Sequence, residues 1–278
     1  MKHVNPSFSL QAPRISFDTA QLFVEAGPMG VSLVVLDDDN SFKAVVTYAF
    51  PAGLPDHELT EKLQQVFNSE NLLQKQYSRS HIFWAFPESI LVPAELMNAD
   101  RNTNMLNLVF GDARQGIIHS DFLYKHNLHN VYRVPQTVAD AINAYLPVAT
   151  QTHLFTSIVN RDMPAGNQLF SIFYNSSLTI MLCREGELQV IQNFEFQNPD
   201  DCVFHLLNVC KGFDVTPETV TLHINGMIDV NSGLYAAIYK YFLQIEFDGL
   251  QADYAYYESV REYPPHFFSH LFALAACV

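Results

Sequence analysis

Basic residues are scarce in this chain. It contains 15 Lys and Arg against 29 Asp and Glu, so its formal net charge is −14. The basic residues form no cluster, whereas a phosphate backbone or an anionic membrane attracts proteins through grouped positive charge. We therefore expect neither nucleic acid nor a membrane surface as a partner.

Long apolar runs and closely spaced cysteines are also lacking. No stretch approaches the ~18 apolar residues that a membrane-spanning helix needs, and residues 1–18 lack the apolar core of a signal peptide. The cysteines show neither C-x-x-C spacing nor the density of a disulfide framework, and three of them are expected in a strand or on helix faces. They are Cys183, Cys202, Cys210 and Cys277. Reduced thiols in a cytoplasmic protein are the expectation.

What the chain does have is apolar content and an internal repeat. Hydrophobic residues make up 49% of it, enough for a substantial core in one large domain or two ordinary ones. Gln21–Phe50 and Gln168–Phe196 both open on Gln-Leu-Phe, break at a polar turn, continue as an apolar strand and turn again on acidic residues. The offset is 147 residues at the start (168 minus 21) and 146 at the end (196 minus 50). Because solenoid units recur every ~20–50 residues, this repeat indicates a duplicated domain.

The first copy predicts an antiparallel meander followed by a crossover helix. Its strands are expected over residues 22–25, 31–36 and 42–48, separated by turns rich in Gly, Pro, Asp and Asn. Asp56 is the expected N-cap of a helix whose apolar positions Leu59, Leu63, Val66 and Phe67 have helical spacing. The apolar run over residues 81–86 predicts a central, parallel strand.

The second copy has the same order of elements. A meander is followed by a helix, with Asp201 as the expected cap and Gly212 as its end, and by a strand over residues 219–224. Three antiparallel strands, a right-handed crossover and a parallel strand are the core of a ribonuclease H-like domain. The fold class is therefore α/β with mixed sheets, built from two such domains.

The remaining segments complete the predicted domain organisation. Between the copies we expect strands over 116–124 and 130–134, a helix over 136–145 and a strand near 152–159, and after the second copy a helix over 233–242 and a strand or helix over 250–257. The predicted divisions are an irregular segment (1–18), a first lobe (19–165), a second lobe (166–262) and an apolar tail (263–278) that packs on the body or on a partner.

Two tandem ribonuclease H-like domains are the architecture of the actin and sugar-kinase superfamily, and particular residues narrow the resemblance. These are Gly30 before the second strand, the aromatic strand closing on Phe86-Pro87-Glu88-Ser89, and the final Leu-Ala-Ala-Cys. On these residues the chain resembles the Bacteroidetes proteins of unknown function grouped as DUF3822. Residues 86–89 followed by Val92-Pro93 are also similar, over a short stretch, to the pilus assembly protein PilM. The resemblance implies an actin-like ATPase fold in a bacterial cytoplasm and supplies no activity.

Actin-like proteins that bind ATP use a tight Asp-x-Gly-Thr/Ser turn in each domain, where backbone N–H groups hold phosphates and the carboxylate positions a metal ion. The first copy keeps Glu25, Gly27 and Gly30 but lacks the hydroxyl, and Pro28 has no N–H to donate. The second copy has neither a carboxylate nor a glycine over residues 172–174, and a single glycine, Gly226, stands where the adenine side usually has a pair. Both turns are therefore expected to be structural.

Other clusters have simpler interpretations than a functional site. Asp37-Asp38-Asp39-Asn40 suits a solvated hairpin turn better than a cation site. His119, His126 and His129 have mixed spacing, and the H-x-x-H pair His126 and His129 lacks the acidic or cysteine companion of a zinc site. His266 and His270 have no third ligand nearby in sequence, and no nucleophile elbow surrounds Ser89. A C-terminal aromatic cluster suits core packing or a protein interface. It comprises Tyr254, Tyr256, Tyr257, Tyr263, Phe267, Phe268 and Phe272.

These observations favour a non-catalytic actin-like platform for a protein partner, with no cofactor. The alternative is a divergent ATPase or small-molecule kinase that binds Mg-ATP, with Glu25 holding a metal-bound water and Gly27, Gly30 and Gly226 allowing close approach of the nucleotide. A third possibility is a scaffold that self-associates through the apolar tail.

Overall fold

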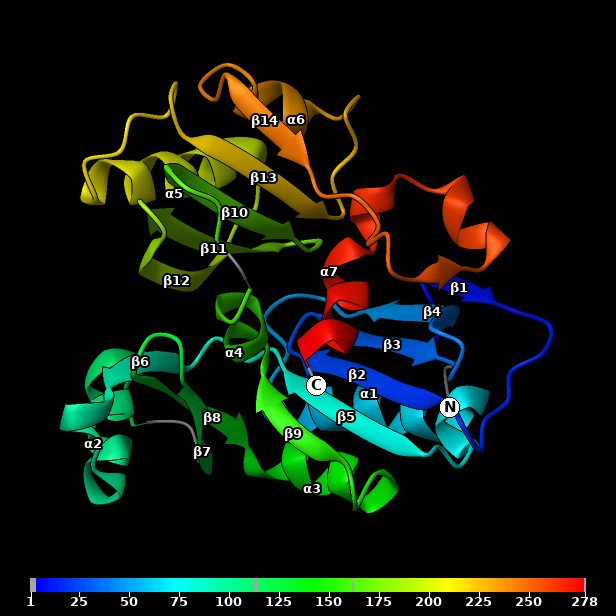
Figure 1. Ribbon diagram of the computed structural model, residues 1–278. Helices are drawn as coiled ribbons and strands as arrows, with labels where there is room; N and C mark the ends of the chain where they lie inside the picture. The colour runs from blue at the N-terminus through cyan, green and yellow to red at the C-terminus, as the bar shows by residue number, and fades with distance from the viewer. Residues whose placement is uncertain (1–3, 113–114, 162, 278) are drawn as a thin grey trace. The chain divides into compact units, whose positions relative to one another are not determined.

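The computed structural model describes residues 4–112, 115–161 and 163–277 (Figure 1). Their contacts divide the chain into two compact units. Unit 1 lies within Met1–Asn160 and also includes Asp253–Tyr257 and Cys277. Unit 2 comprises Arg161–Ala252 and Glu258–Ala276.

Unit 1 is built on a seven-stranded mixed sheet with the order β1-β4-β3-β2-β5-β9, and β15 also pairs with β4. The strands are β1 (Phe8–Gln11), β2 (Gln21–Gly27), β3 (Gly30–Leu36), β4 (Ser41–Ala49), β5 (Arg79–Trp84), β9 (Thr150–His153) and β15 (Ala255–Tyr256). β2, β3 and β4 form the predicted antiparallel meander. β5 lies between β2 and β9 and is parallel to both, so the predicted central strand is confirmed.

The N-terminal segment is more regular than the sequence predicts. Phe8–Gln11 forms β1, antiparallel to β4, with Phe8 opposite Thr47. Its side chains alternate between half-buried and exposed, as expected for a strand at a sheet edge. Four residues between prolines are too short a pattern to identify from sequence.

Two helices cover one face of this sheet, α1 (Asp56–Ser69) and α3 (Gln136–Tyr145). The four apolar positions predicted for α1 are all buried. The predicted cap is wrong: Pro55 occupies the N-cap position in an extended conformation, and Asp56 is the first helical residue. Asp56 and Glu58 still place negative charge in the first turn, where it interacts favourably with the helix dipole.

A second, three-stranded sheet in unit 1 has the order β6-β8-β7 and is antiparallel throughout. Its strands are β6 (Ser89–Pro93), β7 (Gly116–Leu123) and β8 (Leu128–Pro135), and α2 (Ala99–Phe110) packs on it through Leu106. The sequence predicts β7 and β8 and misses β6 and α2. β6 is a five-residue edge strand that begins two residues after Pro87, so its pattern is short.

The strand predicted near residues 152–159 is partly wrong. β9 ends at His153, and the following residues form α4 (Leu154–Val159). The helix begins here because the His153 ring accepts a hydrogen bond from the amide of Phe155 and so caps it. An apolar run of this length suits a strand or a buried helix equally well.

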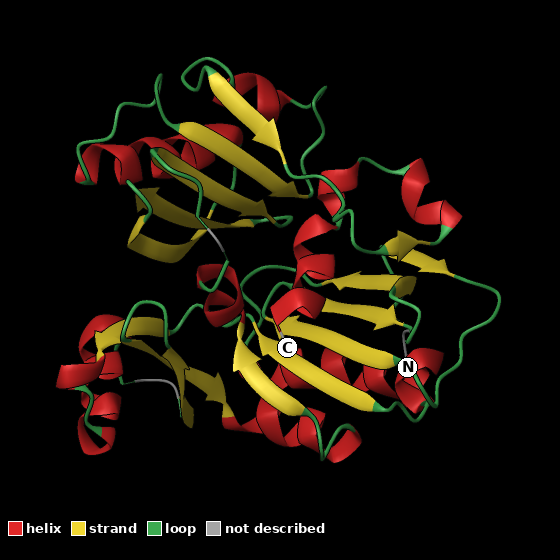
Figure 2. Ribbon diagram, viewed as in Figure 1, coloured by secondary structure: helices red, strands yellow, loops and turns green. Residues whose placement is uncertain are grey.

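Unit 2 contains a five-stranded mixed sheet with the order β12-β11-β10-β13-β14 (Figure 2). The strands are β10 (Asn167–Phe173), β11 (Ser177–Arg184), β12 (Glu187–Glu195), β13 (Thr221–Gly226) and β14 (Gln244–Phe247). In unit 1 the corresponding order is β4-β3-β2-β5-β9, with the same antiparallel and parallel pairings. This agreement is the topology that the sequence repeat predicts.

Helices α5 (Pro199–Gly212) and α6 (Gly233–Ile238) pack together in the core of unit 2. α5 ends at Gly212 as predicted, but its cap is Asn198, whose side chain accepts from the amide of Asp201. Asp201 lies in the first turn instead. α6 ends four residues earlier than predicted, at Ile238.

The C-terminal segment consists of short helical turns. They are the 3₁₀ turns Glu258–Glu262, Pro265–Phe267 and Ala273–Cys277 and the α-helix α7 (Ser269–Phe272). Phe268, Leu271 and Phe272 are buried, and α7 contacts β13. Before it, residues 250–257 contain only the two-residue strand β15.

Candidate functional site

The turn after β2 is a two-residue connection, Pro28-Met29, between the paired residues Gly27 and Gly30. Close packing against neighbouring backbone explains why both positions are glycine. Gly30 has a φ of +149°, and a Cβ there would clash with the carbonyl oxygen of Tyr48 on β4, while a Cβ on Gly27 would lie 2.7 Å from the carbonyl oxygen of Ala85. The backbone around this turn therefore requires glycine whether or not a phosphate ever approaches it.

Glu25 lies in the middle of the unit 1 sheet. It is 5% exposed and stands opposite Ser32 on β3 and Phe83 on β5. Its neighbours Val24 and Ala26 face the core beneath α1 and α3, so strand alternation places Glu25 on the opposite face. Burying a carboxylate in a central strand is costly unless it is paired, so Glu25 is the carboxylate at this turn that a functional hypothesis has to consider.

The turn after β10 is occupied by its own residues. The amide of Tyr174 donates to the carbonyl oxygen of Ser177 at 2.9 Å, and the amide of Met227 donates to that of Phe173 at 2.7 Å. The Phe173 side chain is fully buried, and the Tyr174 ring meets the His270 ring edge-on at a centroid distance of 5.8 Å. The Tyr174 amide and the rings of Phe173 and Tyr174 are thus all in contact with other residues of unit 2.

Gly226 ends β13 directly opposite Phe173 on β10. It has a φ of +84°, and a Cβ there would clash with the Phe173 carbonyl oxygen. This glycine is therefore explained by the close approach of two backbones and does not by itself indicate an adenine site.

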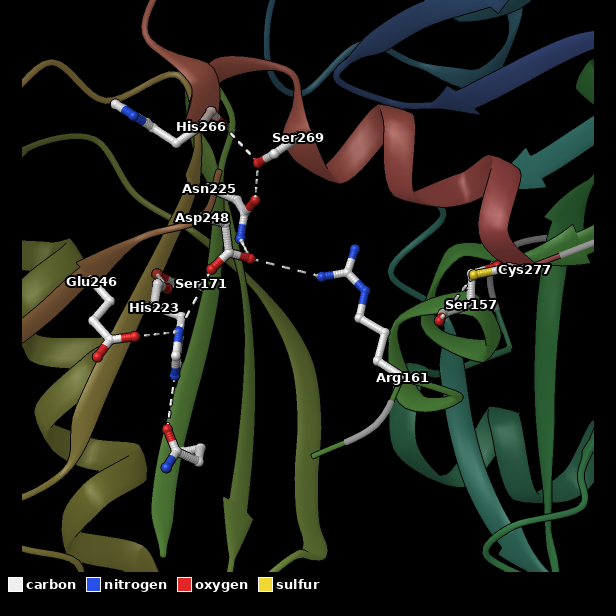
Figure 3. A network of polar contacts seen from close by, with 11 residues as sticks. Ser157, Arg161, Ser171, His223, Asn225, Glu246, Asp248, His266, Ser269 and Cys277 are labelled. Carbon is white, nitrogen blue, oxygen red and sulfur yellow. Dashed lines mark hydrogen bonds and ion pairs between the residues drawn. The ribbon is translucent and has the colours of Figure 1, made fainter. Parts of the chain in front are cut away.

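A polar network in unit 2 joins β10, β13 and the end of β14 (Figure 3). His223 Nε2 lies 2.7 Å from Gln168 Oε1, and His223 Nδ1 lies 3.5 Å from Asp248 Oδ1. The side-chain nitrogen of Gln168 donates a hydrogen bond to the carbonyl oxygen of Ala165. This contact orients Gln168 Oε1 toward His223. Both ring nitrogens of His223 are therefore engaged. Ser171 Oγ donates to the backbone carbonyl of His223 and not to its ring, so the group is no nucleophilic triad.

Asp248 connects this histidine to the C-terminal segment. Asn225 Nδ2 donates to Asp248 Oδ2 at 2.7 Å, Arg161 Nη1 lies 3.9 Å from the same oxygen, and Ser269 Oγ donates to Asn225 Oδ1. Burial raises the pKa of Asp248, but the hydrogen bonds from His223 and Asn225 and the charge of Arg161 outweigh it and hold the pKa below its ordinary value.

The sequence analysis missed this network. The sequence did contain a pattern that could have indicated it: His223 and Asn225 lie on one strand, and Asp248 follows the next strand. These two strands are parallel neighbours, and α/β proteins hold ligands at the carboxyl ends of such strands. The short strand β14, which sets this register, has no pattern long enough to predict it.

The C-terminal histidines belong to the packing of unit 2. His266 Nε2 lies 2.8 Å from the carbonyl oxygen of Ile228, and the ring packs on Phe247. His270 is buried in α7, and burial lowers its pKa to about 3. The two residues stand in separate short helices. Across the described ranges, no group of three His, Cys, Asp or Glu residues is arranged to hold a metal ion.

In unit 1 the polar residues singled out by sequence have separate partners. His119 stacks on Tyr132, His126 Nε2 lies 3.4 Å from the carbonyl oxygen of Val159, and His129 Nδ1 lies 3.0 Å from Ser120 Oγ. Each of these histidines therefore has its own packing or hydrogen-bonding partner in unit 1. Ser89 Oγ donates to Asn130 Oδ1, a structural contact between β6 and β8.

Asp121 on β7 organises the junction with α4. It accepts hydrogen bonds from Thr152 Oγ1, the His153 amide and Thr156 Oγ1 at 2.7–2.8 Å, and from the Tyr132 hydroxyl at 3.3 Å. Four donors satisfy this carboxylate, so it ties the small sheet to β9.

The acidic run after β3 is a hairpin turn. Asp37 Oδ1 accepts from the Asp38 amide and from Thr19 Oγ1, and Lys43 Nζ lies 3.1 Å from Asp39. Asn40 adopts a φ of +57°, a left-handed conformation that Asn tolerates in turns.

The C-terminal aromatic residues serve both units. In unit 1, the rings of Tyr254 and Tyr256 pack on Phe42 at centroid distances of 5.0 and 5.3 Å. In unit 2, Tyr263 and Phe272 meet Phe268 edge-on. The cores of both units therefore use these rings.

All four cysteines lie in the described part of the chain, and none forms a disulfide. Cys183, Cys202 and Cys210 are buried, as the sequence predicts for a strand and a helix, and Cys277 is exposed. Burial raises the pKa of Cys183 and Cys210 to about 11 and that of Cys202 to about 12. Over the described residues, no helix combines the length and apolar character needed to cross a bilayer.

Comparison with known proteins agrees with this architecture. The model of a family described as "Protein of unknown function (DUF3822)" matches residues 15–245. The chain belongs to this family. A Bacteroides thetaiotaomicron protein with an actin-like ATPase fold and unknown function is 19% identical, with a TM-score of 0.77 over 95% of this chain and 100% of that chain. The PilM-PilN type IV pilus biogenesis complex is 13% identical, with a TM-score of 0.60 over 96% of this chain and 100% of that chain. No curated protein matches the sequence.

The predicted fold is therefore confirmed. The DUF3822 chain has the actin-like ATPase fold, with mixed α/β sheets, and its similarity to PilM is distant. At these identities the solved structures establish the fold alone.

Proposed function

We propose that this DUF3822 protein is a non-catalytic member of the actin-like fold that serves as a platform for a protein partner. One observation carries the proposal. In the turn after β10, the Tyr174 amide is bonded to the Ser177 carbonyl and the Tyr174 ring packs against His270 of the C-terminal segment. Phosphate binding in this fold uses backbone amides at that turn, and this one is already occupied.

The turn after β2 supports the same conclusion. Pro28 removes one N–H donor, and the glycines that flank the turn are required by their contacts with neighbouring backbone. A structural neighbour is the PilM-PilN complex, so a protein of similar fold occurs in an assembly with another protein. An actin-like fold whose phosphate turns lack these donors suits such a role. The buried thiols suit a cytoplasmic protein.

Isothermal titration with Mg-ATP tests this proposal. We expect no saturable heat and no release of phosphate. Tight binding with turnover that Glu25→Ala abolishes would overturn it. Glu58→Ala is the matched control, because Glu58 is an exposed glutamate on α1.

One observation favours the alternative, a divergent ATPase or small-molecule kinase. Glu25 is a buried carboxylate two residues before the glycine turn, where it would hold a water bound to Mg²⁺ while Gly27, Gly30 and Gly226 admit the nucleotide. The same titration decides between the two functions. Burial of Phe268, Leu271 and Phe272 within a single chain favours packing of the tail over self-association.

A further inference from the structure

β14 is the outermost strand of the unit 2 sheet (Figure 1). In the described chain it pairs only with β13. The Asp248 amide donates to the Ile224 carbonyl at 3.1 Å, so it points toward β13. Because successive residues of a strand alternate in direction, the N–H and C=O groups of Ile245 and Phe247 point away from the sheet. This edge can accept one more strand.

Exposed aromatic and apolar side chains lie at the start of this edge. Tyr239, Tyr241 and Leu243 lie within the five residues before β14 and are 59%, 46% and 66% exposed. Tyr235 joins them to the strand, since its ring lies 6.0 Å from that of Tyr239 and 5.6 Å from that of Phe247. Tyrosine and large apolar groups are the residues that protein interfaces use at their centres.

The other edge of the same sheet is different. β12 begins and ends with exposed glutamates, and none of the large, strongly exposed apolar side chains of the described residues lies on it. Edge strands are commonly protected by Lys, Pro or a bulge. β14 contains neither Lys nor Pro and pairs in regular register with β13.

Charge indicates what would bind at β14. Residues 161–252 contain 11 acidic against 4 basic residues, a net charge of −7. On β14 itself, the Glu246 side chain is 67% exposed and projects on the same face as Gln244. Every second side chain of a strand added here would lie on the same face of the sheet as Glu246. At the position beside Glu246, a basic residue is favoured.

We propose that β14 binds an extended, basic segment of a partner protein as an added sixth strand. The partner's backbone would pair with Ile245 and Phe247, its basic side chains would face Glu246, and its apolar side chains would contact Tyr241 and Leu243. The inference rests on the proposed platform function and names the chemistry of the partner.

A synthetic peptide of alternating Lys and Val, seven residues long and labelled with a fluorophore, is the probe. Binding to the full chain is measured by fluorescence anisotropy. We expect saturable binding with a Kd below about 1 mM, and a Glu-Val peptide of the same length should bind at least about tenfold more weakly. Absence of saturable binding of the Lys-Val peptide, or equal binding of the two peptides, overturns the proposal.

N-methylation of the peptide tests strand pairing without changing the protein. One version carries methyl groups on the Val amides and another on the Lys amides, so each blocks one edge of the peptide. Strand addition predicts that one version loses at least about tenfold in affinity while the other stays within about threefold. Equal affinities of the unmethylated peptide and both methylated peptides would exclude pairing through the backbone.

Reversing a charge on each of the two edge strands shows at which edge the peptide binds. Glu246→Lys should weaken binding of the Lys-Val peptide about fivefold, whereas Glu187→Lys, the same change on β12, should leave it unaltered. Equal effects of the two substitutions would mean that only net charge matters, which contradicts docking at β14. These measurements use no nucleotide, so their failure is separate from that of the Mg-ATP titration.

Discussion

Replacing Gly226 with Ala separates two explanations of this residue, backbone packing and access for a nucleotide. Gly226 has a φ of +84°, and a Cβ there would clash with the Phe173 carbonyl oxygen and lie 2.9 Å from the Phe173 amide nitrogen. The same carbonyl accepts the Met227 amide at 2.7 Å. The substitution therefore strains the pairing of β10 with β13 at the centre of unit 2.

Gly186 provides a matched control for the backbone conformation. Its φ is +80°, yet a Cβ there would meet nothing within 4 Å. Gly186→Ala should cost about 1–2 kcal/mol from the left-handed conformation alone. Gly226→Ala adds about 1–3 kcal/mol for the clash and about 1 kcal/mol for the weakened hydrogen bond, so the two variants should differ by about 2–4 kcal/mol.

Urea unfolding followed by far-ultraviolet circular dichroism measures this difference. Circular dichroism is preferable to fluorescence because the only tryptophan, Trp84, lies in unit 1. With a slope of about 2–3 kcal/mol per molar urea, the midpoint of Gly226→Ala should fall about 1 M below that of Gly186→Ala. Equal midpoints would refute the packing explanation. Loss of Mg-ATP binding in a fully stable Gly226→Ala variant would favour the nucleotide role.

Two further predictions concern buried titratable groups. Burial lowers the pKa of His270 to about 3, so the folded state holds the neutral ring while the unfolded chain takes up a proton below pH ~6.5. Stability should therefore fall as the pH drops from 6.5, and His270→Gln should reduce the loss between pH 7 and pH 5 by about 2 kcal/mol in urea unfolding; an unchanged loss contradicts this. In the native protein a chromogenic disulfide should react rapidly with Cys277 alone, because the other three thiols are buried with raised pKa values. Rapid reaction of two or more thiols would show that their burial is incomplete.

Local patterns identified the elements with strong periodicity. The helix α3 has the predicted bounds, and β2, β3 and β4 lie where alternation and turn residues place them. The helix caps were less predictable. Asp56 and Asp201 are both acidic residues in the first turn, but the capping positions belong to Pro55 and Asn198, one residue and three residues earlier. The residue at which a helix begins is set by its backbone conformation, and neighbouring polar residues in the sequence do not reveal which of them adopts the capping conformation.

The glycines of the candidate site show the limit of motif reasoning. In sequence, Gly30 and Gly226 are compatible with either phosphate binding or packing. Only the tertiary structure shows the carbonyl groups of Tyr48 and Phe173 standing where a Cβ would be. The network around Asp248 likewise depends on β14, four residues whose register with β13 no local pattern specifies.

By itself the sequence determined that this chain is a duplicated, acidic α/β protein, because periodicity, turn residues and a repeated order of elements are written locally and act over short range. The tertiary structure decided what the phosphate turns contain, which polar side chains meet and which strand edge stays open. Those properties arise from residues far apart in the chain, such as Tyr174 and His270, which come together only when the apolar core of their unit is packed.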